Sequence, residues 1–155
     1  MDVETRLRRL EAKEAIRELR YKYAWAVDAG DVDRFLDLFT TEAEIRFPQE
    51  AADRLPVSGR DELAEFVRTI DNTLRFSAHM LHNPTITVDG DEARGTWYVD
   101  VPEVTADGAV WVQGRYEDEY RRTEDGWKFT SIEISYNYRA SPAEGWRLED
   151  IEAWE

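Results

Sequence analysis

The sequence predicts an α+β domain in which three N-terminal helices pack on one face of a strongly curved antiparallel sheet. Apolar residues recur at three- and four-residue steps only in the first half of the chain. From residue 73 onward the chain alternates like strands, and Asn-Pro or Asp-Gly pairs separate the successive strands. Helices followed by a meander of strands form two layers. A sheet that curls around a long helix encloses a cavity, which gives a cone-shaped domain.

Three segments carry the helical spacing. We expect one long helix from Val3 to Asp28, a short one from Val32 to Phe39 and a third from Arg60 to Asn72. Gly30 suits the left-handed residue that follows a helix, and Asp31 is a candidate N-cap for the second helix. The three helices therefore have local start or stop signals of their own.

The remaining elements are expected to be strands. They run from Ala43 to Phe47, Thr73 to His82, Thr85 to Val88, Glu92 to Val101, Ala109 to Arg122 and Trp127 to Tyr138. This order excludes a parallel doubly wound sheet, and the sequence has no Gly-rich phosphate-binding loop. We expect one domain over residues 1–139 and a tail over 140–155, which would be a lid, an oligomer contact or disordered.

The composition of the chain excludes several classes of binding partner and chemistry. Its 155 residues suit a single domain, and its net charge is −14. That charge argues against nucleic acid, since the protein would repel phosphate, and against anionic membrane surfaces. There is no cysteine, hence no thiolate chemistry. The N-terminal segment is charged throughout and no apolar run approaches bilayer length, so we expect a cytoplasmic protein.

The chain has only two histidines, His79 and His82, three residues apart in one predicted strand. Strand alternation places His82 on one face with Phe76 and Met80, and His79 on the other with Ser77. Either histidine fits proton transfer or a structural role, and the spacing does not choose between them. Two histidines on opposite faces cannot bind one metal ion, and no third ligand stands at a recognisable spacing, so we expect no metal site.

Tyr23 and Asp28 lie at the C-terminal end of the long helix. Each fits a structural role, Tyr23 as a core aromatic residue and Asp28 as a helix-end carboxylate. An aspartate is unfavourable at the negative end of the helix macrodipole, which indicates some other demand on Asp28. A phenol and a carboxylate that face a strand imidazole would form a group suited to proton transfer.

Several segments resemble the SnoaL-like branch of the NTF2-like superfamily, whose fold is cone-shaped and cystatin-like. Residues 15–28 (AIRELRYKYAWAVD) resemble its first helix, and residues 77–84 (SAHMLHNP) and 95–98 (GTWY) its middle strands. Residues 116–120 (YEDEY) and 125–129 (DGWKF) resemble its closing hairpin. The resemblance extends from about residue 3 to 138, in the same order of elements.

Within this branch the pattern is closest to that of bacterial bile-acid 7α-dehydratases. In that family a helix tyrosine, an aspartate five residues later and a strand histidine form the site. Tyr23, Asp28 and His79 stand at the matching positions, so the resemblance selects His79 over His82. A further family aspartate follows a Trp-Tyr pair. Asp100 falls one residue short of that position, where Val101 stands, and would serve only if the strand carried a bulge.

The resemblance implies a cofactor-free lyase that removes water from a small, hydrophobic, hydroxylated carbonyl compound, steroid-like or polyketide-like. His79 would be the general base, Asp28 would orient it, and Tyr23 would bind the substrate carbonyl. Two alternatives stay open, a double-bond isomerase of the ketosteroid isomerase type and a non-catalytic module that binds a small ligand. Halide elimination is disfavoured, because the dehydrochlorinase pattern has a lysine in place of Tyr23 and an arginine near Ile132.

Seven aromatic residues are candidates to line the substrate pocket, although each would fit the core equally well: Trp25, Phe47, Phe66, Phe76, Trp97, Trp111 and Tyr136. The late strands carry enough apolar residues for both faces of the sheet: Val110, Val112, Tyr116, Phe129, Ile132, Ile134 and Tyr136. A sheet covered by helices on one face needs a partner on the other. We therefore expect a homo-oligomer, trimer before dimer. The alternative is a monomer whose tail, Arg147 to Glu155, covers the sheet.

Overall fold

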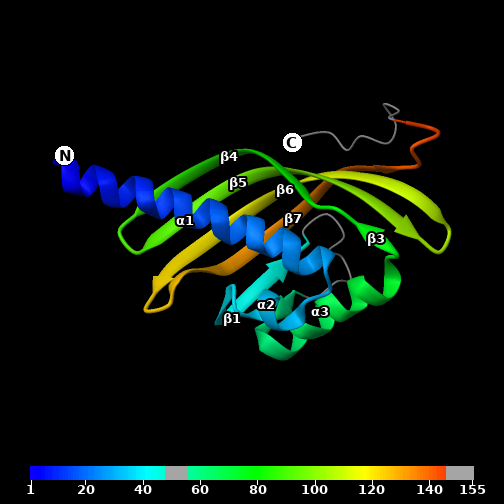
Figure 1. Ribbon diagram of the computed structural model, residues 1–155, viewed down its shortest axis with the longest axis horizontal. Coiled ribbons are helices and arrows are strands. Elements are labelled where there is room, and N and C mark those ends of the chain that lie inside the picture. Colours follow the sequence, from blue (N-terminus) through cyan, green and yellow to red (C-terminus); the bar gives the residue numbers. More distant parts are fainter. Residues whose placement is uncertain (48–55, 146–155) are drawn as a thin grey trace.

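The computed structural model describes residues 1–47 and 56–145 and has the expected α+β architecture, with three helices on a strongly curled sheet (Figure 1). The elements are α1 (Val3–Asp28), α2 (Val32–Leu36), β1 (Phe39–Arg46), β2 (Val57–Ser58), α3 (Gly59–Thr73), β3 (Phe76–Ser77), β4 (Met80–Asp89), β5 (Glu92–Thr105), β6 (Gly108–Thr123) and β7 (Gly126–Ala140).

Helix α1 lies across the inner face of the sheet and has the bounds expected from the sequence. Asp2 caps it, because its carboxylate accepts a hydrogen bond from the backbone N–H of Thr5 at 2.8 Å. Its buried stripe includes Ile16, Tyr23 and Val27, which face the sheet. No helix in the described part of the chain is long and apolar enough to cross a membrane.

Helix α2 is shorter than expected and ends at Leu36. The prediction that it continues to Phe39 is wrong, because Phe39 begins β1 and pairs with Phe129 of β7. The backbone N–H of Phe129 donates to the carbonyl of Leu38 at 2.9 Å. Pairing with a strand 90 residues away therefore outweighs the local helical spacing.

The sheet has the order β2-β1-β7-β6-β5-β3, and β4 also pairs with β5. The expectation of a fully antiparallel sheet needs one correction, because β1 runs parallel to β7. Strands β5, β6 and β7 are long, and every residue of β5 from Glu92 to Thr105 pairs with β6 in one unbroken register. These three strands form the curved wall that faces α1 (Figure 1).

The predicted strand from Thr73 to His82 is divided in the structure. Thr73 still belongs to α3, β3 comprises only two residues, and β4 starts at Met80. The predicted break at Asn83-Pro84 is instead a bulge inside β4, where the register with β5 shifts and Asn83 has φ of 47°. A proline is tolerated there because a bulge leaves its position without a ladder hydrogen bond.

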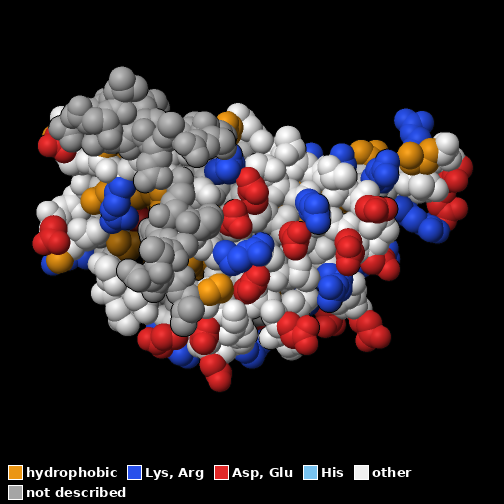
Figure 2. Space-filling view, turned by 180° about the vertical axis from the view of Figure 1, so that it is seen from behind, with side chains coloured by type: hydrophobic (Ala, Val, Ile, Leu, Met, Phe, Trp, Pro, Cys, Tyr) orange, Lys and Arg blue, Asp and Glu red, His pale blue; other side chains and the backbone are white. Residues whose placement is uncertain are grey.

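The two faces of the sheet differ in chemistry. Of the late-strand apolar residues, Val112, Tyr116, Phe129, Ile132 and Ile134 are all buried in the core. Val110 and Tyr136 are only partly buried and pack against this core, and Val110 also lines a hollow on the outer face. The outer face carries ion pairs such as Arg94–Glu119, at 3.4 Å, and Arg115–Glu117, at 3.2 Å. Figure 2 shows acidic and basic side chains interspersed over this side of the molecule.

Candidate active site

The end of α1 and the break between β3 and β4 meet at three hydrogen bonds to one carboxylate. His79 Nδ1 lies 2.6 Å from Asp28 Oδ1, and the backbone N–H of His79 donates to Asp28 Oδ2 at 2.8 Å. The hydroxyl of Ser77 donates to Oδ1 of Asp28 at 2.8 Å. The side chains of His79 and Asp28 remain 11% and 19% exposed, so the group is sheltered and still open to solvent at one side.

The chain geometry explains why His79 points at the helix. Ala78 still donates its backbone N–H to the carbonyl of Pro102 in β5, at 3.3 Å, whereas the next N–H leaves the sheet and binds Asp28. The edge strand is thus interrupted where the carboxylate replaces a ladder partner. The hydrogen bonds that Asp28 accepts here explain why an aspartate stands at the unfavourable end of the α1 macrodipole.

The electrostatics of the group define the state of its imidazole. Burial alone would raise the pKa of Asp28, but the hydrogen bonds from His79 and Ser77 outweigh it and the pKa lies below its ordinary value of 3.8. Asp28 is therefore ionised at neutral pH and can only accept hydrogen bonds. In a neutral His79 ring the proton therefore lies on Nδ1, toward Asp28, and Nε2 has the lone pair that a general base needs.

Tyr23 lies deeper on the same inner side, among aromatic rings. Its ring centroid is 5.3 Å from that of Phe35, 6.0 Å from Tyr116 and 5.8 Å from Phe129. Burial raises the pKa of Tyr23 to about 12, although the nearby Arg20 acts in the opposite sense. Within the described residues no hydrogen bond joins Tyr23 to Asp28 or His79. The structure therefore brings Asp28 and His79 into contact and places Tyr23 among the core rings next to Arg20.

Asp100 is not part of this group. Its carboxylate lies 3.2 Å from Nε2 of His82, on the other face of the sheet. The bulge that would turn Asp100 inward is missing from β5, since Asp100 pairs with Gln113 and Val101 with Val112 in an unbroken register. The bulge belongs to the neighbouring strand β4. As alternation predicts, the two histidines lie on opposite faces, and the structure places His79 toward α1 and His82 on the outer face.

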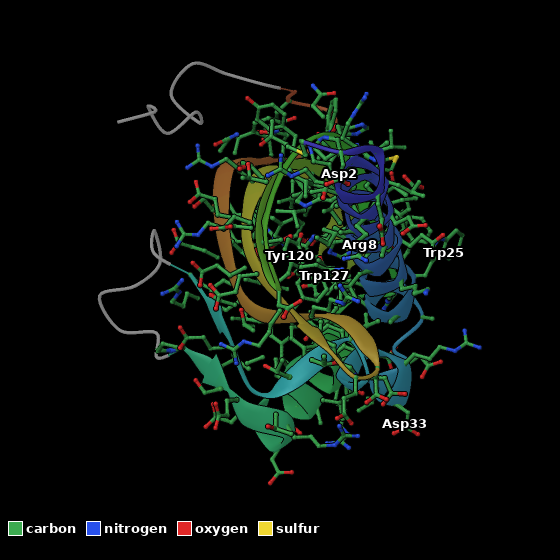
Figure 3. All side chains as sticks on the ribbon, turned by 90° about the vertical axis from the view of Figure 1, so that its left-hand side faces the viewer. Asp2, Arg8, Trp25, Asp33, Tyr120 and Trp127 are labelled. Atoms are coloured by element: carbon green, nitrogen blue, oxygen red, sulfur yellow. The ribbon has the colours of Figure 1, made fainter. Side chains whose placement is uncertain are left out.

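The seven candidate pocket residues do not share one cavity. Trp25 is 78% exposed and points away from the sheet, as Figure 3 shows, and Phe76 is 53% exposed. Trp97 is buried and donates Nε1–H to the hydroxyl of Tyr120 at 3.1 Å. Trp111 lines an outer hollow, and the other three lie in or against the core: Phe47, Phe66 and Tyr136.

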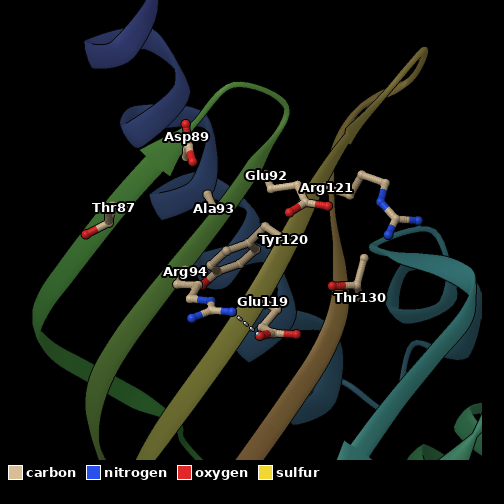
Figure 4. Close-up of a pocket in the computed structure, with 9 residues that line it drawn as sticks. All are labelled: Thr87, Asp89, Glu92, Ala93, Arg94, Glu119, Tyr120, Arg121 and Thr130. Carbon is tan, nitrogen blue, oxygen red and sulfur yellow. Dashed lines mark ion pairs between the residues drawn. The ribbon is translucent and has the colours of Figure 1, made fainter.

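Two hollows lie away from Asp28 and His79. A polar one of about 460 Å³ at the far end of the sheet is lined by Asp89, Glu92 and the Arg94–Glu119 pair (Figure 4). An apolar one of about 480 Å³ on the outer face is lined by Phe76, Met80 and Trp111, among others. In the described part of the chain no group of three or more histidine and acidic residues is arranged to hold a metal ion.

The comparison with protein families identifies the family of the chain. A family model described as a SnoaL-like domain matches residues 8–133. The chain belongs to the SnoaL-like domain family. The comparison with curated proteins found no match.

Solved structures similar to this SnoaL-like protein include proteins with different names. One from Novosphingobium aromaticivorans, provisionally named an aromatic ring hydroxylase, is 34% identical over 87% of this chain and 96% of its own, with a TM-score of 0.77. A protein of the same organism, provisionally named scytalone dehydratase, is 19% identical over 92% of each chain, with a TM-score of 0.76. A hexachlorocyclohexane dehydrochlorinase from Novosphingobium barchaimii is 21% identical over 90% of this chain and 94% of its own, with a TM-score of 0.77. The last two show a shared fold.

Sequence reasoning missed two features of this SnoaL-like protein. Ser77 was placed on the face of His79 but not recognised as a partner of Asp28, although that alternation was the available signal. Arg20 and Asp118 form a fully buried ion pair, with Nη2 and Oδ1 3.2 Å apart. Its only sequence signals are an arginine inside the apolar stripe of α1 and an aspartate at an inward position of β6, 98 residues later.

Proposed function

We propose that this SnoaL-like protein is a lyase that removes water from a small, hydrophobic, hydroxylated carbonyl compound by proton abstraction. The observation that carries the proposal is the contact of His79 Nδ1 with Asp28 Oδ1 at 2.6 Å. It leaves Nε2 of His79 as a base whose orientation is fixed by an ionised carboxylate. This is the arrangement in which histidine accepts a proton and its positive charge is stabilised.

The reaction follows from that geometry. Nε2 of His79 takes the proton from the carbon next to the carbonyl, and the electron pair moves into the carbonyl as an enolate. Asp28 stabilises the imidazolium that forms, while the hydroxyl of Tyr23 donates a hydrogen bond to the enolate oxygen. The enolate then expels the hydroxyl on the neighbouring carbon, which leaves as water with the proton carried by His79. Atoms balance without an oxidant or reductant.

The substrate we propose is cyclic and largely apolar. Tyr23 and its neighbours Phe35, Tyr116 and Phe129 make the inner side aromatic next to the polar Asp28–His79 pair. The relative that is 34% identical has a name that refers to an aromatic ring, which supports the same class of substrate. Apolar walls with few convergent polar groups are typical of small-molecule sites.

The test starts from a thermal-shift screen of hydroxylated cyclic ketones, because a ligand of the native state raises the melting temperature. A compound that binds is then incubated with the protein, and the product is analysed by mass spectrometry. Loss of water supports the dehydratase, whereas a product of unchanged mass identifies the double-bond isomerase. Binding without any product would leave the non-catalytic ligand-binding module as the function.

The chain offers matched controls, because it has two histidine–aspartate pairs on opposite faces. His79→Ala and Asp28→Asn should lower the rate by about 10²–10⁴-fold, the usual contribution of a positioned general base. His82→Ala and Asp100→Asn, which alter the pair with the 3.2 Å contact, should leave the rate unchanged. Near-wild-type activity of His79→Ala on a true substrate would refute the proposal.

A further inference from the structure

A fully buried cation lies one helical turn before Tyr23. Arg20 and Asp118 are both completely shielded from solvent, and Nη2 of Arg20 lies 3.2 Å from Oδ1 of Asp118. The other carboxylate oxygen accepts a hydrogen bond from the hydroxyl of Tyr120 at 2.6 Å, and that hydroxyl accepts one from Trp97 Nε1 at 3.1 Å. Asp118 thus holds one edge of the Arg20 guanidinium and is itself held by Tyr120, which Trp97 contacts in turn.

The faces of the guanidinium are held by rings. Its central carbon lies 3.6 Å from the ring centroid of Tyr116, 4.3 Å from that of Tyr23 and 5.3 Å from that of Phe129. Nε and Nη1 of Arg20 have no hydrogen-bond partner among the described residues. The charge is therefore presented to the aromatic rings and is neutralised on one side only, by Asp118.

Stability alone does not explain such a pair. Removing two charges from water costs several kcal/mol per ion, and apolar replacements of similar volume are often neutral or stabilising. What the pair does supply is a fixed positive charge beside a phenol. Burial raises the pKa of Tyr23, and Arg20 opposes that rise more strongly than Asp118 adds to it.

We propose that Arg20, fixed by Asp118, is a positioning residue for Tyr23, which it orients and polarises as a hydrogen-bond donor for a substrate oxygen. This proposal rests on the proposed function, because it gives Arg20 a role only if the hydroxyl of Tyr23 meets the carbonyl of the substrate. A positive charge near the phenol favours negative charge on its oxygen. It therefore strengthens the hydrogen bond to the enolate as charge develops there.

The groups that act on Tyr23 come from several elements. Arg20 belongs to the same helix, Asp118 and Tyr116 belong to β6, and Tyr136 belongs to β7. Of these only Arg20 carries a positive charge, and only its removal should make the phenol of Tyr23 less acidic. Loss of packing would have the opposite effect, since solvent entry brings a buried phenol back toward its ordinary pKa of 10.

The experiment measures the pKa of residue 23 directly and needs no substrate. A fluorinated tyrosine, more acidic than tyrosine, is incorporated at position 23 of the full chain and titrated by ¹⁹F NMR, with circular dichroism to check that the fold persists. In Arg20→Met the pKa should rise by about 1 unit or more, the size expected for a charge at this distance. In Arg20→Lys, which keeps the charge, the rise should be smaller. In Asp118→Asn the pKa should fall.

Arg20→Met distinguishes the proposal from a merely structural role, because a structural role predicts that the pKa of residue 23 falls in this variant too, as in Asp118→Asn. A rise supports the proposal, and a fall or no change overturns it. If Arg20→Met does not fold, Arg20→Met/Asp118→Asn has no uncompensated buried charge and should still show a rise, with the same two readings. Since no substrate is present, failure of this test is distinct from failure of the His79→Ala test.

Discussion

His79 binds Asp28 twice, through its backbone N–H at 2.8 Å and through Nδ1 at 2.6 Å, so that both oxygens of one carboxylate hold one residue. The two bonds fix the imidazole relative to the end of α1, independently of the position of β4, which follows His79. They also use the carboxylate as the missing ladder partner of an interrupted edge strand. Asp28 therefore has both a structural role, as partner of the His79 backbone, and a chemical one, as partner of its imidazole.

The first prediction concerns the pH dependence of stability. The hydrogen bonds of Asp28 hold its pKa in the folded protein below the ordinary 3.8. A lowered folded-state pKa means that the stabilisation is complete above pH 3.8 and is lost as the pH falls through the folded value. Asp28→Asn should therefore cost about 1–3 kcal/mol of unfolding free energy at pH 7 and markedly less in acid.

Urea unfolding of both proteins at pH 7 and well below pH 3.8 measures this difference. Asp100→Asn is the matched control. Its carboxylate bonds a half-exposed histidine on the outer face, so its loss should cost within about 1 kcal/mol. A gap between wild type and Asp28→Asn that is the same at both pH values would contradict the prediction.

The second prediction concerns the turn that follows Asp28. Gly30 has φ of +61°, and a Cβ added there would lie 2.5 Å from Oδ1 of Asp71 on α3. Gly90 has nearly the same backbone conformation, φ of +60°, and open space around it. Gly90→Ala should cost about 1–2 kcal/mol for the left-handed conformation alone, and Gly30→Ala should cost clearly more.

Thermal unfolding of the two variants isolates the steric part as their difference. Asp71→Ala removes the two closest atoms, Oδ1 and Cγ, and leaves Cβ at 3.1 Å, so it should bring the cost of Gly30→Ala closer to that of Gly90→Ala. Equal losses for the two glycine variants in the presence of Asp71 would show that α3 moves freely away from this turn.

Elements with local signals could be predicted from the sequence. Helix α1 was predicted to the residue, because the exposed side, the buried stripe and the turn at Gly30 are all encoded within it. The end of α2 and the strand over residues 73–82 were predicted wrongly, because distant partners decide them. Phe39 pairs with Phe129, and the N–H of His79 leaves the sheet for Asp28.

The same distinction applies to the site. Alternation and the family resemblance were enough to place Asp28 and His79 on one side of the sheet. They were not enough to place Asp100, since the bulge that decides its face occurs in β4 and not in β5. Arg20 and Asp118 are 98 residues apart, and no local sequence pattern predicts that they are in contact.

The third prediction concerns assembly. The outer face of the sheet is mostly charged, but it ends in an apolar patch where Phe76 and Met80 are 53% and 46% exposed beside Trp111. We expect this patch to be the contact of a homo-oligomer, trimer before dimer. Light scattering should give a multiple of 18.2 kDa for the wild type. Met80→Asp should lower the mass to that of the monomer, and Arg94→Glu, in the charged region, should not.

A wild-type mass near 18.2 kDa would refute the oligomer. It would favour the monomer whose tail covers the sheet, a prediction that concerns residues 147–155, outside the described part of the chain. A mass that is unaffected by Met80→Asp would place the contact elsewhere, for example at the exposed apolar residues Val3, Leu7 and Leu10 of α1.

The last prediction concerns the buried ion pair and follows from an asymmetry between its partners. Burial raises the pKa of Asp118 to about 6, although Arg20 and Tyr120 oppose the rise, whereas an arginine keeps its charge at any pH that a protein survives. A folded-state pKa above 3.8 means that Asp118 contributes stability at low pH that is lost as the pH rises through about 6.

In Arg20→Met the cation that opposes the rise is gone, so Asp118 should stay protonated to a higher pH and ionise only at a cost. Urea unfolding should therefore show a modest loss for Arg20→Met at about pH 5 that grows toward 3–5 kcal/mol at about pH 8. Asp118→Asn does not titrate and leaves Arg20 without an anion at every pH, so its stability should not follow the fall of the wild type with rising pH, and its loss relative to wild type should be smaller at pH 8 than at pH 5. The double variant should cost less than the sum of the two at pH 8, because neither charge is left unpaired. A loss for Arg20→Met that does not change between the two pH values would show that Asp118 does not titrate within the fold.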